Sequence, residues 1–162
     1  MFKLFQDRLE EAEDYSEVWK VVKDSVEYAL GKSRQGMMLF LDDLPLRLGA
    51  YHPWGTNNIV LNRTLVELVE DNLKSKRAVN SLIYNLLLHE YLHALGDPSE
   101  RKVRQMVFEV CQKCFGESYI ATSLAHRGPW SLLSNIPLYP MRVSKRGMEI
   151  VKDFEEPGGY II

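Results

Sequence analysis

Residues 77–95 read RAVNSLIYNLLLHEYLHAL, the longest stretch of the chain with helical periodicity and no internal glycine or proline. Its leucines and its isoleucine fall on most of the helix circumference instead of on one stripe. A helix that is apolar on nearly all sides lies in the centre of a domain. The segment therefore predicts a buried central helix, and Gly96 is expected to end it.

Two histidines and a glutamate interrupt this apolar helix: His89, Glu90 and His93, in the pattern H-E-x-x-H. Residues four apart stand on one helix face with their Cβ atoms about 5–6 Å apart, so both imidazoles can reach one metal ion. Zinc accepts imidazole nitrogens, and a catalytic zinc keeps one position for water. Glu90 is turned about 100° around the helix axis, where it can meet that water instead of the metal.

The alternative is that these three side chains merely lie on a helix surface. That interpretation is disfavoured because a charged group buried among leucines is costly unless it is paired or lies beside a metal ion. We therefore expect His89 and His93 to bind Zn²⁺ and Glu90 to act as a general base.

The segment HEYLHALG at residues 89–96, with the strand-like NIVLN upstream, resembles the zincin metallopeptidases. The resemblance is to minimal, single-domain members and extends over residues 36–115. It implies an α+β fold in which a small mixed sheet packs against the buried HExxH helix. It also implies hydrolysis of peptide bonds by a zinc-bound water that Glu90 activates.

In zincins, the strand before the active-site helix is a sheet edge that binds extended substrate. Two short strands on either side of a Pro/Gly/Asn turn are expected to pair here as a hairpin. The resemblance implies that a peptide docks by strand addition on one of these two strands, either residues 46–51 or the second strand. The residues of that second strand are Asn58, Ile59, Val60, Leu61 and Asn62.

The motif itself leaves the third metal ligand open. Metzincins have a third histidine where this chain has Ser99, a poor zinc ligand, whereas gluzincins use a glutamate from the following helix. Glu100 is the first candidate, because helical geometry places it on the apolar side of its helix, facing the central one. Its alternative role is to form a capping box with Asp97. Further candidates are His126, Glu109 and Glu117.

Peptide hydrolysis also needs a group that stabilises the oxyanion. Tyr119 and His126 are candidates by residue type only, and each has a structural role as its alternative. Two other functions stay open: a non-proteolytic or latent zinc protein that serves interaction or regulation, and a zinc hydrolase of non-peptide amides. A peptide deformylase would need a cysteine ligand upstream, and the first cysteine is Cys111.

The N-terminal part of the chain has helical spacing over residues 9–30, read as one or two helices. Ser16 is expected to cap the stronger half, and Gly31 to end it. Residues 36–41 then predict a buried strand.

Downstream, Thr64 is expected to cap a short helix, with Glu67 in the capping-box position. Two more helices are expected at 97–115 and 120–125. From Pro137 onward, loops that leave room for one strand are expected. This order indicates one α+β domain over residues 1–162 with a small sheet.

The chain has 162 residues and a formal net charge of −2, which limits the classes of function. No overall positive field exists to attract nucleic acid or an anionic membrane. The apolar runs are far shorter than a membrane span, and no secretory signal is expected because the first residues become charged before any long apolar run. Cys111 and Cys114 form no disulfide framework and are expected to pack in the core. The sequence favours a soluble cytoplasmic protein whose partner is a peptide or protein substrate.

Overall fold

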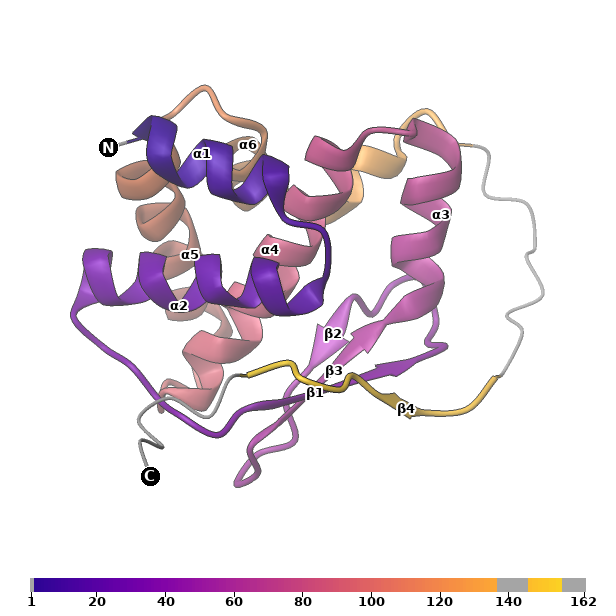
Figure 1. Ribbon diagram of the computed structural model, residues 1–162, viewed down its shortest axis with the longest axis horizontal. Helices are drawn as coiled ribbons and strands as arrows, with labels where there is room; N and C mark the ends of the chain where they lie inside the picture. The colour runs from indigo at the N-terminus through magenta and orange to yellow at the C-terminus, as the bar shows by residue number, and fades with distance from the viewer. Residues whose placement is uncertain (1, 137–145, 156–162) are drawn as a thin grey trace.

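The computed structural model describes residues 2–136 and 146–155, which form the α+β fold expected from the sequence (Figure 1). Helices and strands do not alternate regularly, and the four strands join in one small sheet. The elements in chain order are α1 Phe2–Glu11, α2 Tyr15–Leu30, β1 Met38–Asp42, β2 Ala50–Tyr51, β3 Asn58–Asn62, α3 Arg63–Leu73, α4 Lys76–Ala94, α5 Glu100–Phe115, α6 Ile120–Arg127, the 3₁₀ helix η1 Pro129–Leu133 and β4 Glu149–Ile150.

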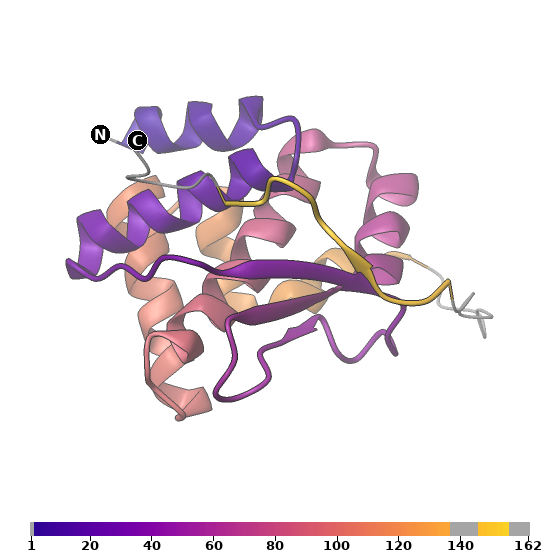
Figure 2. The ribbon, with the colours of Figure 1, turned by 60° about the horizontal axis from the view of Figure 1, so that its bottom comes forward.

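The sheet is mixed, with the strand order β2-β3-β1-β4. The β1–β3 pair is parallel, whereas β2 pairs with β3 and β4 pairs with β1 in antiparallel fashion. The helices gather on one side of this sheet (Figures 1 and 2). Strand β4, from the C-terminal part of the chain, forms the edge of the sheet next to β1. The strand allowed after Pro137 is therefore β4, while residues 137–145 and 156–162 lie outside the described residues.

The predicted hairpin is present, but its strands have the opposite roles to those expected. Strand β3 pairs with β2 on one side and with β1 on the other, so the expectation that residues 58–62 form a free sheet edge is wrong. Four of its five residues are also buried. The outermost strand is β2, the alternative stretch, which is reduced to Ala50–Tyr51.

Helix α4 is the central helix that the sequence predicts. It contacts every other α-helix as well as β2 and β3. Every residue from Ala78 to Ala94 is buried except His89 and His93, which are half-buried. The two histidines of the HExxH pattern are thus the side chains between Ala78 and Ala94 that are partly accessible to solvent.

The residues that cap α2 and α3 each lie two positions before the predicted cap. Asn62, rather than Thr64, caps α3 by accepting from the backbone N–H of Leu65, and Asp14, rather than Ser16, caps α2. Gly31 ends α2 as expected, in the left-handed conformation. Ser, Thr, Asp and Asn are all preferred at the N-cap, so several residues near a helix start can take that position. Tertiary contacts decide which of them caps the helix.

The two cysteines pack in the core as expected. Cys111 and Cys114 are free and fully buried on α5. Burial raises the pKa of the Cys114 thiol to about 12, which keeps it protonated and unreactive. Within the described ranges, no helix is both long and apolar enough to cross a membrane.

Candidate metal centre

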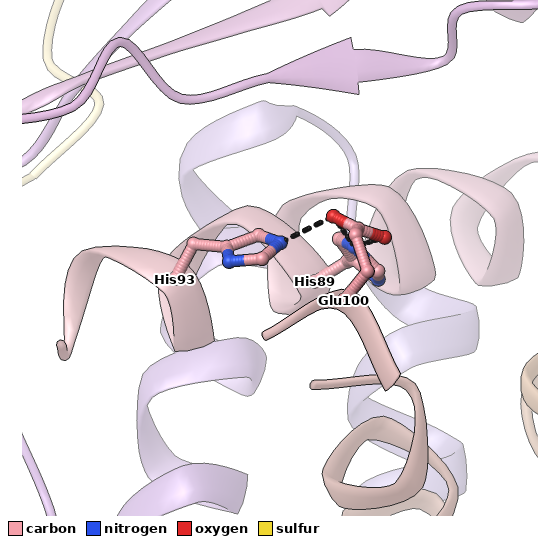
Figure 3. Close-up of side chains that lie close together, drawn as sticks. All are labelled: His89, His93 and Glu100. Atoms are coloured by element: carbon pink, nitrogen blue, oxygen red, sulfur yellow. Dashed lines mark hydrogen bonds and ion pairs between the residues drawn. The ribbon is translucent and has the colours of Figure 1, made fainter. Parts of the chain in front are cut away.

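The three candidate ligands converge where α4 turns back into α5. His89 and His93 lie one turn apart near the end of α4, and Glu100 is the first residue of α5. Oε1 of Glu100 lies 2.6 Å from Nε2 of His93, and Oε2 lies 3.1 Å from Nε2 of His89. The carboxylate faces both imidazole rings, as Figure 3 shows. One nitrogen from each histidine and one oxygen from Glu100 lie within 4.8 Å of one another.

The N-cap of α5 shows whether Glu100 forms a capping box with Asp97 or is available as a metal ligand. The side chain of Ser99 accepts from the backbone N–H of Lys102 and so caps α5. Asp97 lies outside the helix and accepts from the backbone N–H of Ser99 instead. The capping box between Asp97 and Glu100 is therefore not formed. The Glu100 carboxylate is free to turn toward the two histidines.

A hydrogen bond to Asp97 leaves the other ring nitrogen of His93 available to a metal ion. Its Nδ1–H donates to the carbonyl oxygen of Asp97 at 2.8 Å, and a carbonyl can only accept. In the neutral imidazole, Nε2 then carries a lone pair that faces the Glu100 oxygen. A backbone carbonyl on the far ring nitrogen is also the usual support of a metal-binding histidine.

His89 adds a neutral nitrogen ligand. Burial lowers the pKa of its imidazole, and the nearby Glu100 carboxylate opposes this effect only in part. The neutral form is the one that binds metals. Two imidazole nitrogens and one carboxylate oxygen form a donor set that suits zinc and leaves a fourth position for water.

Glu90 lies beside this cluster without being one of its ligands. The residue is buried, and burial, followed by the charge of Glu100, raises the pKa of its carboxyl to about 8. The backbone N–H of His52 opposes that shift. A divalent cation nearby would lower the pKa again. An acid with this setting can both take up and release a proton near neutral pH.

A cleft of about 840 Å³ opens above these residues. His89, Glu90 and His93 from α4 line it on one side, and β2 lines it on another. Trp54 and Trp130, both exposed, provide apolar walls. The metal-ligand cluster, the candidate base and the outermost strand therefore share one open space.

The other predicted site residues separate into those at the cleft and those elsewhere. His126 lines the cleft but is not part of the ligand cluster. Glu117 accepts from the side-chain amide of Gln112, and Tyr119 donates to Glu10. Glu109, Glu117 and Tyr119 are not among the residues that line the cleft. Within the described part of the chain, Glu100 is thus the third ligand candidate that the structure brings to the two histidines.

His52 is a residue of the cleft that the sequence pattern does not indicate. His52 is half-buried, and its Nδ1–H donates to the carbonyl oxygen of Asn58 at 2.8 Å. That bond holds the turn after β2 in place next to Glu90. Nothing in the local sequence marks this contact, because it depends on the packing of the hairpin over α4.

Comparison with models of known protein families, with curated proteins and with solved structures finds no match. The chemistry of this centre is accordingly inferred from its own residues.

Proposed function

We propose that the chain is a zinc-dependent metallopeptidase of the zincin type, in which His89, His93 and Glu100 hold Zn²⁺ and Glu90 is the general base. The observation that carries this proposal is the convergence of two imidazole nitrogens and a carboxylate oxygen within 4.8 Å on an otherwise buried helix. A glutamate beside the first histidine supplies a candidate base, and the open cleft gives a substrate access to it.

When bound, zinc supplies a Lewis acid that polarises a carbonyl and makes water more acidic. The carboxylate of Glu90 accepts a proton from the attacking water and passes it to the departing amine nitrogen. The backbone N–H of His52 interacts with that carboxylate and limits its orientation. The carbonyl of Asp97 keeps the His93 ring in the tautomer that offers Nε2.

The position of β2 at the edge of the sheet supports a peptide as the substrate. Strand β2 is outermost in the sheet, and within the described residues no other strand pairs with its outer edge. It lines the same cleft as Glu90. An extended peptide can pair with such an edge through its main chain while its side chains enter adjacent pockets. The exposed Trp54 and Trp130 would contact those side chains.

Metal analysis combined with a cleavage assay tests this function. We expect one zinc per purified chain, loss of zinc in His93→Ala, and cleavage of a casein-type substrate. Glu90→Ala should keep the zinc and lose cleavage, because Glu90 moves the proton and does not hold the metal.

Purified wild-type protein that takes up no zinc would contradict the metal centre. Cleavage that survives Glu90→Ala would point to a contaminating protease. Zinc binding without cleavage of any peptide would instead support the alternative, a non-proteolytic zinc protein of the same fold.

A further inference from the structure

Three arginines line the cleft from three separate elements. Arg47 comes from the loop between β1 and β2, Arg104 from α5, and Arg127 from the end of α6. All three are exposed. Arg104 lies one helical turn beyond Glu100, on the same face of α5. Positive charge therefore enters the cleft from several sides.

These arginines lack the acidic partners that four other arginines of the described residues have. Arg63 and Arg146 both pair with Asp43, for example. Within residues 2–136 and 146–155, no ion pair or side-chain hydrogen bond is formed by Arg47, Arg104 or Arg127.

The three arginines outnumber the acidic residues that line the cleft. Within the described chain these acidic residues are Glu90 and Glu100, the proposed base and metal ligand. The protein as a whole carries a net charge of −2, so the basic character is local to the cleft. A cleft in which one sign of charge predominates attracts substrates of the opposite sign.

We infer that this cleft selects acidic peptides, with Arg47, Arg104 and Arg127 as the residues that determine the preference. The inference rests on the proposed function and deepens it by naming the substrate class. Carboxylates suit arginine because the guanidinium group offers paired donors in a plane. They can come from aspartate and glutamate side chains near the scissile bond or from the free C-terminus of a peptide.

Peptide binding to the full-length Glu90→Gln protein tests this preference without requiring turnover. Fluorescence anisotropy would compare three labelled peptides of equal length: an acidic one with an amidated C-terminus, a neutral amidated one, and a neutral one with a free C-terminus. We expect the acidic peptide to bind about tenfold more tightly than the neutral amidated one. Raising the salt to about 1 M, where the Debye length is about 3 Å, should reduce this difference.

Substitution of the arginines shows whether they cause the preference. Arg104→Gln should reduce the ratio of acidic to neutral affinity about two- to fivefold, as expected for one solvated ion pair, and the triple substitution should abolish the ratio. Arg101→Gln is the matched control, since Arg101 is an exposed arginine on the same helix outside the cleft. It should leave the ratio unchanged.

The possible outcomes separate this inference from the proposed function. Arginine-dependent binding of acidic peptides supports the inference even if none is cleaved. If the neutral peptide with a free C-terminus also binds more tightly than its amidated form, the arginines bind the terminal carboxylate of the peptide. Equal binding of acidic and neutral peptides, no binding of any peptide, or a preference that survives the triple substitution overturns it. Cleavage of neutral and acidic peptides at equal rates would leave the proposed function standing without this specificity.

Discussion

His93 and Glu100 show how the centre depends on single side chains. One ring nitrogen of His93 is occupied by the Asp97 carbonyl, and the other faces Glu100 at 2.6 Å. Glu100 is exposed and belongs to a different helix, so its position depends on the cap at Ser99. The proposed metal centre is therefore shared between a buried helix and the solvent-exposed start of the next one.

Removal of Glu100 should cost the protein much of its zinc affinity. Loss of a hydrogen-bond partner of a metal ligand typically costs about 10–100-fold in affinity, and loss of the ligand itself should cost more. We expect Glu100→Ala to weaken zinc binding by more than about 100-fold in a competition titration with a chelator. His126→Ala is the control from the same cleft. Loss of zinc affinity in His126→Ala, with none in Glu100→Ala, would assign the third position to His126 and remove Glu100 from the site.

The central helix and the hairpin differ in how far their sequences reveal them. Helix α4 is recognisable because apolar residues surround it, and the two histidines with Glu90 stand out against that background. The sheet edge is not recognisable, because strand order depends on which distant strand adds to β3. Strand β1 does so here and covers the side that was expected to bind substrate.

The cap positions were missed for a related reason. Asp14, Asn62 and Ser99 each lie within three residues of another plausible cap, and the choice between them follows from tertiary contacts. The side-chain amide of Asn62, for example, donates to the carbonyl oxygens of Leu44, Pro45 and Leu48. Those bonds hold the loop that leads into β2, which the local sequence does not indicate.

Gly49 allows β2 to lie close to α4, and a larger residue there should disturb the site. A Cβ atom at Gly49 would lie 2.6 Å from Cδ2 of the buried Leu86. Overpacking of this kind typically costs about 1–3 kcal/mol. We expect Gly49→Ala to lower kcat because it displaces β2 and the His52 backbone from Glu90, while zinc content is kept. Kinetic assays and metal analysis of the same preparations check both parts.

A second variant separates the clash from other effects of the substitution. Leu86→Ala makes room for the new methyl group, so Gly49→Ala should lower kcat less in the Leu86→Ala background than in the wild type. An additive loss in the double variant would contradict the proposed contact between β2 and α4.

Across the whole molecule, Asp43 joins segments that are far apart in sequence. Its carboxylate is covered and accepts from Arg63 at 2.9 Å and from Arg146 at 2.7 Å, while Thr64 donates to it at 2.9 Å. Arg146 also pairs with Glu67. The segment that leads into β4 is thereby attached to the end of β1 and the start of α3.

These contacts predict a specific pH dependence of stability. The guanidinium groups of Arg146 and Arg63 hold the pKa of Asp43 well below its usual range. Because the folded-state pKa is lower than the unfolded value of about 3.9, the ionised group stabilises the fold above about pH 4, and this contribution is lost as the pH falls below that value.

Denaturant unfolding of Asp43→Asn against the wild type measures this contribution. At pH 7 the variant should be less stable by about 1–3 kcal/mol, because two arginines lose a charged partner. Between about pH 4 and pH 2 the difference should shrink, since the wild-type carboxyl loses its advantage as it approaches protonation. A difference that stays constant over this range would show that Asp43 acts through packing alone.

The central claim is that two elements of one domain, α4 and α5, hold a single zinc ion through His89, His93 and Glu100. Anomalous diffraction at the zinc absorption edge, from crystals of the zinc-supplemented wild-type protein, tests it most directly. We predict one strong anomalous peak, about 2.0–2.2 Å from Nε2 of each histidine and from a carboxylate oxygen of Glu100. The absence of a peak there, or a peak held by His52 or His126 instead, would contradict it.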